Sequence, residues 1–354
     1  MNGYGSSTHA GGSGTSIGMY GQGLGNTGLT TETGSDQGVA PHKDQLADRR
    51  VMFMGLPRSG KTSIIKVVLD NEQAYDTLGL LSTTQRTEHR MMPGITVYDF
   101  PGIDDYAESQ YIVLNPDIYE GEHTSLVFVV DSQSDIQSAI TALFSVMRTA
   151  QSVNPHIPIN VFINKIDGLS EELKQDIQHD IQQRVLKNMS FENLNCDHMH
   201  FLLTTIYSES IKEAFSKVIQ YLVPQHSSLE AIINSFCSKS SLDKVLLIDF
   251  STKIYLATDS SPTYSPRYTF ACKTIDVIDE ISALCGSYVP VDEDDLPLQR
   301  INVALDGYED IFIYQISPSL TLFCFGPPQI ISQTSLLEFN GSKVAKAIRK
   351  LLPI

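Results

Sequence analysis

The amino-acid sequence predicts an α/β domain with a mostly parallel sheet, followed by a smaller α+β domain. Three observations support this prediction. Short apolar runs alternate with amphipathic stretches from residue 50 to residue 222, a different order of elements follows Pro224, and residues 1–45 are rich in Gly, Ser and Thr. Alternation of strands with helices favours a parallel sheet that is covered on both faces.

Composition limits the class of protein. A chain of 354 residues is long enough for two domains, and its 42% hydrophobic content is enough to build their cores. The net charge of −16 argues against a nucleic-acid-binding protein, which would need a basic face. Five scattered cysteines without a CxxC pair, and no secretory, lipidation or transmembrane signal, lead us to expect a reducing, cytosolic compartment.

The elements of the first domain are expected in a regular order. Short apolar runs predict strands at residues 50–54, 95–100, 125–130, 157–163 and 200–205. Apolar residues at helical spacing predict helices at residues 59–69, 135–152, 170–187 and 210–222. We place this domain at residues 46–225, after a disordered tail at residues 1–45 whose composition cannot bury enough surface to fold.

The second domain, at residues 226–354, is expected to be compact. Its predicted helices cover residues 229–236, 268–284 and 332–352. Its predicted strands cover residues 244–250, 253–258, 299–305, 310–316 and 320–325, the first two as a hairpin around Ser251-Thr252 and the third after an acidic loop at residues 292–295. The first two strands and the 268–284 helix carry more apolar residues than one small sheet needs, which predicts a dimer surface.

A phosphate-binding loop is predicted between the first strand and the first helix. Gly55-Leu56-Pro57-Arg58-Ser59-Gly60-Lys61-Thr62 matches GxxxxGK[ST] in the required strand–loop–helix context. Glycines let backbone N–H groups approach a polyphosphate, and the helix directs its positive end at the anion. We expect Lys61 to reach the β- and γ-phosphates and Thr62 to bind Mg²⁺. The candidate binding residues here are Arg58, Ser59, Gly60, Lys61, Thr62 and Ser63.

Further candidate residues complete the phosphate and metal site. Asp99-Phe100-Pro101-Gly102 ends a strand, so Asp99 is expected to hold Mg²⁺ and the Gly102 N–H to meet the γ-phosphate. The hydroxyl-rich loop between these motifs contains Thr77, and a threonine here would complete the Mg²⁺ shell when a triphosphate is bound. Thr83 is the first choice for that threonine and Thr84 is the alternative.

The base pocket is predicted from Asn164-Lys165-Ile166-Asp167, an NKxD motif that follows the strand at residues 157–163. Asp167 can accept hydrogen bonds from N1–H and the 2-amino group of guanine, whereas adenine offers neither. The Lys165 stem would lie over the base, and Asn164 would connect this loop to the phosphate loop. Thr205 and Ile206, after the next strand, are expected to finish the site.

Together these motifs make the chain resemble the Rag GTPases, specifically the C/D-type subfamily, over residues 50–354. Beyond the phosphate, metal and base motifs, the resemblance includes Val153-Asn154-Pro155, Gly168-Leu169-Ser170, Asp180-Ile181-Gln182-Gln183-Arg184, Thr205-Ile206-Tyr207 and the stretch from Ser251 to Pro262. The form Asp99-Phe100-Pro101-Gly102 favours the C/D type over the A/B type.

The resemblance implies a Ras-like G domain that binds GTP or GDP with Mg²⁺, followed by a roadblock-type dimerisation domain. It implies a heterodimer with an A/B-type Rag, docked on a lipid-anchored scaffold at the cytosolic face of the lysosome or vacuole. Such dimers respond to a GTPase-activating protein and relay amino-acid availability to target-of-rapamycin complex 1, with the GDP-bound form of this type as the activating one.

One departure concerns hydrolysis. Residue 103 is Ile, where Ras-like proteins and many C/D-type Rags carry a Gln that orients the attacking water. Asp104 or Asp105 are the candidate substitutes, and we assign no catalytic residue. A slow GTPase that depends on an activating protein is the leading hypothesis, a non-hydrolysing scaffold subunit of the same heterodimer is the second, and a metabolic P-loop kinase or ATPase is the third.

Overall fold

The computed structural model describes residues 49–91, 94–104, 115–121, 123–192, 194–195, 197–223, 225–262, 265–285, 300–304 and 309–352. Every described residue belongs to one compact unit, Asp44–Ile354. The predicted tail at residues 1–45 and the acidic loop at 292–295 lie outside the described residues, and so does Pro224. The domain boundary at residues 225/226 stays a prediction.

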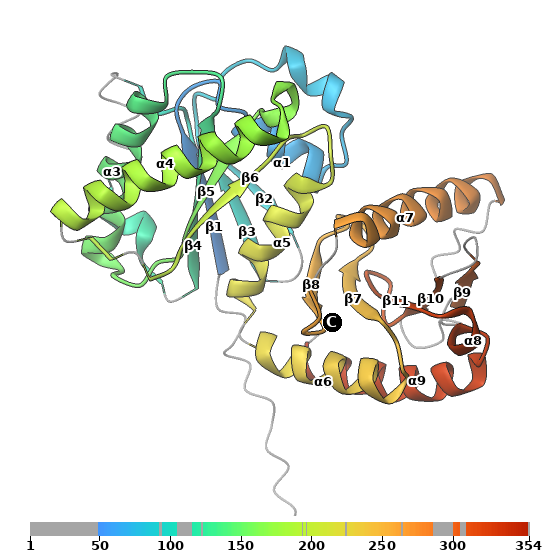
Figure 1. Ribbon diagram of the computed structural model, residues 1–354. Helices are drawn as coiled ribbons and strands as arrows, with labels where there is room; N and C mark the ends of the chain where they lie inside the picture. The colour runs from blue at the N-terminus through green and yellow to red at the C-terminus, as the bar shows by residue number, and fades with distance from the viewer. Residues whose placement is uncertain are drawn as a thin grey trace, which may run out of the picture. The chain divides into compact units, whose positions relative to one another are not determined.

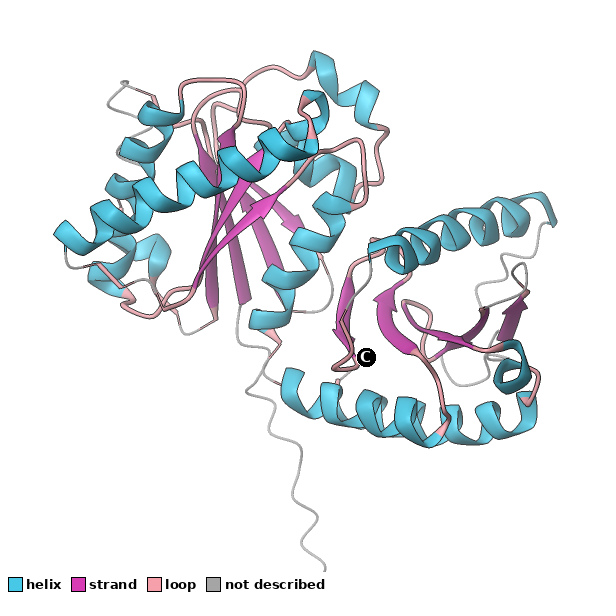
Figure 2. Cartoon of the chain, viewed as in Figure 1, coloured by secondary structure: helices cyan, strands magenta, loops and turns pink. Residues whose placement is uncertain are grey.

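The first sheet is mostly parallel (Figures 1 and 2). Its strands are β1 (Arg49–Gly55), β2 (Thr87–Arg90), β3 (Ile95–Asp99), β4 (Thr124–Asp131), β5 (Ile159–Asn164) and β6 (Met199–Leu203). They lie in the order β2-β3-β1-β4-β5-β6, and only the edge strand β2 runs antiparallel to its neighbour. Strands β1 and β4 are apolar along most of their length because both faces of the sheet are covered.

Among the described residues, four helices cover the two faces of this sheet (Figure 1). They are α1 (Lys61–Leu69), α3 (Ile136–Val153), α4 (Glu171–Glu192) and α5 (Ser210–Leu222). Helices α1 and α5 pack on one face, where the Phe53 ring of β1 stacks on the Phe215 ring of α5 with centroids 5.4 Å apart. Helices α3 and α4 pack on the other face. Short 3₁₀ turns η1 (Ala74–Gly79), η2 (Pro116–Tyr119) and η3 (Ile166–Gly168) connect the elements.

The second sheet is antiparallel throughout, with the strand order β8-β7-β11-β10-β9. Its strands are β7 (Lys244–Asp249), β8 (Tyr255–Thr258), β9 (Arg300–Val303), β10 (Asp310–Gln315) and β11 (Leu320–Gly326). Helix α7 (Ser265–Cys285) lies on one face, and α6 (His226–Lys239) and α9 (Thr334–Leu351) lie on the other, next to the short α8 (Pro328–Ile331) (Figure 1).

The exposed apolar surface predicted for the second domain is present on α7 but not on β7 and β8. Strands β7 and β8 are buried nearly throughout, because this chain's own helices cover both faces, so their contribution to an exposed dimer surface was wrongly predicted. On α7, Ile275 is fully buried because this side of the helix packs on the sheet. The sequence predicts an apolar stripe on this helix made of Ile275, Ile278, Ile281 and Leu284, with Val277 and Ala283 beside it. Its exposed large side chains are Val277, Ile281 and Leu284, with exposed fractions of 52%, 54% and 87%. We call these three residues the α7 stripe.

The predicted fold class is confirmed: a mostly parallel α/β sheet precedes a smaller α+β part with an antiparallel sheet. The main helices and strands that the sequence predicts are present, with ends displaced by a few residues. Strand β2 and helix α8 were not predicted. Within the described ranges, no helix combines the length and apolar character needed to cross a bilayer.

Candidate nucleotide-binding site

The candidate site lies where parallel strands end. Strands β1, β3 and β5 finish at Gly55, Asp99 and Asn164, at one edge of the first sheet, which is where open α/β sheets bind ligands. A cavity of about 510 Å³ opens at this edge. It is lined by Pro57, Arg58, Gly60, Lys61, Thr62, Ser63, Thr77, Leu78, Gly79, Leu80, Leu81, Ser82, Thr83, Gly102, Gln133, Asn164, Lys165, Asp167, Ile206 and Tyr207.

Two glycines of the cavity wall have no room for a side chain. Gly60 has a φ of 101°, and a Cβ atom there would lie 2.4 Å from Nδ2 of Asn164. A Cβ atom on Gly102 would lie 2.6 Å from the Cα atom of Pro57. Both separations are shorter than any ordinary van der Waals contact, so the backbone itself forms this wall. Such a wall suits a ligand that is held by backbone N–H groups.

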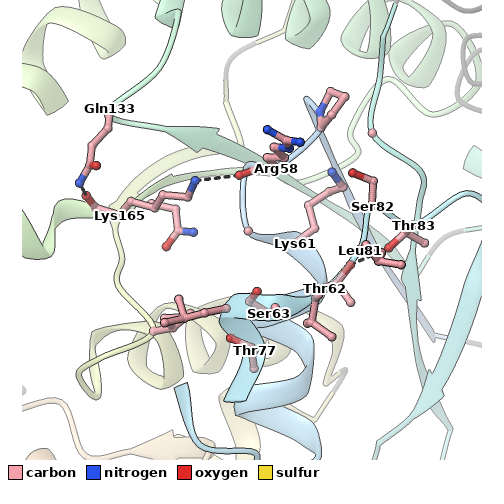
Figure 3. Close-up of a pocket in the computed structure, with 18 of the residues that line it drawn as sticks. Arg58, Lys61, Thr62, Ser63, Thr77, Leu81, Ser82, Thr83, Gln133 and Lys165 are labelled. Atoms are coloured by element: carbon pink, nitrogen blue, oxygen red, sulfur yellow. Dashed lines mark hydrogen bonds between the residues drawn. The ribbon is translucent and has the colours of Figure 1, made fainter. Parts of the chain in front are cut away.

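Lys61 is the buried cation of the phosphate loop. It is the first residue of α1, is only 6% exposed, and its Nζ donates hydrogen bonds to the carbonyls of Gly55 at 3.2 Å and Leu56 at 3.0 Å. Burial lowers the pKa of Lys61 to about 8, against the opposing effect of the nearby Asp99 carboxylate. Figure 3 shows the side chain lying beside Arg58 and Ser82 in the cavity.

Thr62, Thr83 and Asp99 bring their oxygens together beside the phosphate loop. Oγ1 of Thr62 lies 2.7 Å from Oγ1 of Thr83 (Figure 3). Oγ1 of Thr62 also donates to Oδ2 of Asp99 at 2.6 Å, and Oγ1 of Thr83 donates to the same carboxylate oxygen at 3.3 Å. The other carboxylate oxygen, Oδ1, is buried without a hydrogen-bond partner. Burial raises the pKa of the Asp99 carboxyl, although hydrogen bonds from Thr62 oppose the effect. Two hydroxyls and a buried carboxylate are hard oxygen donors that fit Mg²⁺.

The base loop is attached to the phosphate loop by side-chain hydrogen bonds. Nδ2 of Asn164 donates to the Ser59 carbonyl at 3.0 Å. Lys165, at a φ of 63°, donates from Nζ to the Arg58 carbonyl at 2.8 Å (Figure 3). It also forms a 2.6 Å ion pair with Asp131 at the end of β4. These contacts hold the two loops at a fixed separation. A ligand that fills the cavity therefore meets both loops at once.

Asp167, on η3, also lines the cavity. Its Oδ1 accepts a 2.8 Å hydrogen bond from Oγ1 of Thr205. A carboxylate that faces a cavity can accept two parallel hydrogen bonds from a planar ligand, which is the pattern that guanine offers and adenine lacks. The structure therefore brings the predicted phosphate loop, the hydroxyls of Thr62 and Thr83 and the Asp167 carboxylate around one cavity.

Comparison with known proteins agrees with this arrangement. The family model described as "Gtr1/RagA G protein conserved region" matches residues 50–275. The chain belongs to the Gtr1/RagA G protein family. It is 35% identical over 314 residues to Ras-related GTP-binding protein D of Mus musculus, a match that covers 86% of this chain and 68% of the mouse protein.

The relatives also separate the two types of the family. GTP-binding protein gtr2 of Schizosaccharomyces pombe is 36% identical over 309 residues, which cover 86% of this chain and 98% of gtr2. GTP-binding protein gtr1 of the same yeast is only 22% identical over 218 residues, which cover 60% of this chain and 69% of gtr1. Within the Rag family, the chain is therefore more similar to the C/D and gtr2 type than to gtr1.

The predicted site residues of this Rag-family chain fall into two groups. Those that line the cavity are Arg58, Gly60, Lys61, Thr62, Ser63, Thr77, Thr83, Gly102, Asn164, Lys165, Asp167 and Ile206. Ser59, Asp99 and Thr205 stand behind this wall and hold its residues by hydrogen bonds. Thr83 rather than the exposed Thr84 meets Thr62 and Asp99. The binding roles of all these residues stay predictions.

Sequence reasoning missed several residues of the cavity. Gln133 lines the cavity and donates from Nε2 to the Lys165 carbonyl at 2.8 Å (Figure 3). The available signal was its position two residues after the end of β4, at the same sheet edge as the motifs. Tyr207 also lines the cavity, directly after Thr205 and Ile206. Leu78, Gly79, Leu80, Leu81 and Ser82 had no motif to mark them.

Ile103 takes no part in the cavity wall. Its side chain is 8% exposed and packs into the apolar cluster beneath the sheet edge, together with Phe100 and Met54. Its backbone N–H donates to the Gly55 carbonyl at 3.0 Å, which fixes its direction. Asp104 is described and does not line the cavity, and Asp105 lies outside the described residues.

Proposed function

We propose that this chain is a guanine-nucleotide-binding signalling switch, the C/D-type half of a Rag GTPase heterodimer. The observation that carries the proposal is that one cavity gathers a buried lysine, a threonine–aspartate oxygen cluster and a guanine-type carboxylate acceptor. In support, two relatives whose matches cover 86% of this chain are named Ras-related GTP-binding protein D and GTP-binding protein gtr2.

The residues have distinct roles in this proposal. Backbone N–H groups at the start of α1 and the Lys61 ammonium bind the β- and γ-phosphates of GTP. Thr62 and Asp99 hold Mg²⁺ in both nucleotide states, and Thr83 joins them when the γ-phosphate is present. Bound Mg²⁺ supplies charge neutralisation on the phosphate oxygens. Asp167 selects guanine, because adenine would leave its carboxylate without donors.

Competition binding tests the nucleotide. The full chain, stripped of nucleotide, is titrated with a fluorescent GDP, which is then displaced by unlabelled GTP or ATP. We expect displacement by GTP at stoichiometric concentration and none by ATP at a hundredfold excess. Equal displacement by ATP would favour a P-loop kinase or ATPase and would contradict the role of Asp167.

We further propose that the chain hydrolyses GTP slowly and depends on a GTPase-activating protein. With Ile103 packed in the core, no side chain at this position reaches toward the cavity to orient water. The alternative is a non-hydrolysing scaffold subunit, in which the nucleotide only stabilises the fold. Single-turnover GTP hydrolysis, with and without an activating protein for C/D-type Rags, separates the two: stimulation supports the switch, and its absence supports the scaffold.

The proposed partner is an A/B-type Rag that pairs through the second, antiparallel sheet region. Two observations support this surface. The α7 stripe leaves Val277, Ile281 and Leu284 exposed. In the part of the chain that the structure describes, β9 ends the strand order of the sheet, so its outer backbone groups are placed to pair with another strand. A similar domain of the partner would cover both features together.

Co-purification of the full chain with an A/B-type Rag tests this surface. Ile281→Glu and Leu284→Glu place charges on the α7 stripe and are expected to reduce the heterodimer recovered at least tenfold. Leu173→Glu on α4 is the matched control, since Leu173 is a comparable exposed leucine, at 44%, outside this surface. Undiminished heterodimer in both stripe variants would contradict the proposed interface.

Finally, we propose that the heterodimer acts at the cytosolic face of the lysosome or vacuole. There a lipid-anchored scaffold would hold it, and the dimer would relay amino-acid availability to target-of-rapamycin complex 1. Imaging of the tagged chain tests this location. We expect the wild-type chain at the lysosomal or vacuolar surface and the Ile281→Glu variant dispersed, while uniform dispersal of both would contradict the proposal.

A further inference from the structure

Two exposed tyrosines touch across the cavity's edge, although they lie far apart in the sequence. Tyr75 belongs to η1 and Tyr207 follows the Thr205-Ile206 segment. Their ring centroids are 5.4 Å apart with an interplanar angle of 53°. The rings are 75% and 43% exposed, so the contact is not a part of the buried core. An exposed contact of this kind joins two surface segments without supporting the fold around them.

Each ring is attached to a different wall of the cavity. On the Tyr75 side, the buried Thr77 closes the η1 turn by donating from Oγ1 to the Ala74 carbonyl at 2.8 Å, and Thr77 and Leu78 line the cavity. The residues that follow them, through Thr83, continue the same wall. Tyr75 therefore belongs to the same segment as Thr83, the predicted threonine of the cation site, and a displacement of one would move the other.

On the opposite side, Tyr207 is linked to the guanine acceptor. Its backbone N–H donates to Oγ1 of Thr205 at 3.4 Å, and the same hydroxyl donates to Oδ1 of Asp167 at 2.8 Å. Tyr207 itself lines the cavity. A continuous chain of contacts therefore runs from η1 through the rings of Tyr75 and Tyr207 and the Thr205 hydroxyl to the Asp167 carboxylate.

We propose that the Tyr75–Tyr207 contact is a latch that slows the release of bound guanine nucleotide. The inference rests on the proposed function, because it requires a nucleotide in this cavity. Tyr207 lines the cavity and its ring contacts Tyr75 of η1, so the contact opposes any separation of the η1 segment from the segment that follows Thr205. In this proposal, the bound nucleotide leaves when these two segments separate. Aromatic pairs contribute enough beyond simple burial to change a rate constant about two- to tenfold.

Dissociation kinetics of the full chain test the latch. The chain is loaded with a fluorescent GDP and chased with excess unlabelled GDP, and the release rate is measured. Tyr75→Ala and Tyr207→Ala are each expected to raise the rate about two- to tenfold. The double variant is expected to be no faster than the faster single variant, because either truncation already opens the latch. Tyr75→Phe keeps the ring and should release GDP at the wild-type rate.

The chain provides a matched control. Tyr221 on α5 pairs with His200 at a centroid distance of 5.2 Å and an interplanar angle of 48°, and neither residue lines the cavity. Tyr221→Ala should therefore leave GDP release unchanged. The latch is refuted if either single variant releases GDP at the wild-type rate, or if the two effects multiply in the double variant. Failure of the wild-type chain to bind fluorescent GDP would instead refute the proposed function.

Discussion

Replacing Gly60 by Ala should destabilise the fold and weaken nucleotide binding, because the added methyl group causes both backbone strain and a clash with Asn164. The backbone at Gly60 has a φ of 101°, which an alanine adopts only with strain. Such strain costs about 1–3 kcal/mol. The added Cβ would also lie 2.4 Å from Nδ2 of Asn164, which now donates to the Ser59 carbonyl at 3.0 Å.

Displacement of Asn164 would break the hydrogen bond between the base loop and the phosphate loop. A hydrogen bond of this type contributes about 0.5–1.5 kcal/mol. The two costs together predict a loss of about 2–4 kcal/mol, shared between the free energy of unfolding and the free energy of nucleotide binding. Against a total stability of about 5–15 kcal/mol for a typical domain, this loss is large.

Urea unfolding measures the change in the free energy of unfolding, and GDP titration measures the change in the free energy of nucleotide binding. Gly79→Ala is the matched control, because Gly79 also lines the cavity and a Cβ atom there would meet nothing within 4 Å. We expect this control to stay within about 0.5 kcal/mol of wild type in both measurements. If Gly60→Ala behaves like Gly79→Ala in stability and in GDP affinity, the reasoning from the phosphate-loop backbone is wrong.

Three further predictions follow from single contacts. Lys61→Ala removes the buried cation and should weaken GDP binding at least a hundredfold; wild-type affinity in a titration would contradict its role. Asp167→Asn should exchange guanine preference for xanthine preference in competition binding, because an amide N–H faces the 2-oxo group of xanthine; retained GTP affinity with XTP rejected would contradict the base pocket. Lys244→Met leaves the buried Asp259 carboxylate without its 3.3 Å cationic partner and should lower the urea unfolding free energy by about 3–5 kcal/mol; an unchanged midpoint would show that the pair is dispensable.

The sequence predicts the first sheet well because its strands are apolar on both faces. Residues 124–131 and 159–164 contain almost no exposed position, so their boundaries differ from the prediction by only one or two residues. Strand β2 has the sequence Thr-Glu-His-Arg and is mostly exposed. It exists because β3 offers a free edge for hydrogen bonds, which is a tertiary cause without a local apolar pattern.

In the candidate site too, some residues could be predicted from a local motif, whereas others are positioned only by tertiary packing. Motif residues such as Lys61 and Asp167 are fixed by their place at strand ends, and the structure gathers them around one cavity. Gln133 and Tyr207 reach the cavity because of how the loops pack, which spacing along the chain does not reveal. We predicted exposed apolar surface at residues 244–250, but these residues are buried. Helices cover both faces of this strand, and the sequence of the strand alone does not reveal how many faces are covered.

The two parts of the proposed dimer surface would recognise a partner by different chemical groups, one by its backbone and the other by its side chains. Among the described strands β9 ends the sheet, and its outer edge would present peptide N–H and C=O groups, which are the same in every protein, so pairing at this edge would give affinity with little choice of partner. The α7 stripe presents side chains that differ between proteins. Discrimination between a second copy of this chain and a different chain must then reside in α7. A few substitutions on that helix would be enough to change which subunit is chosen, without altering any strand of the sheet.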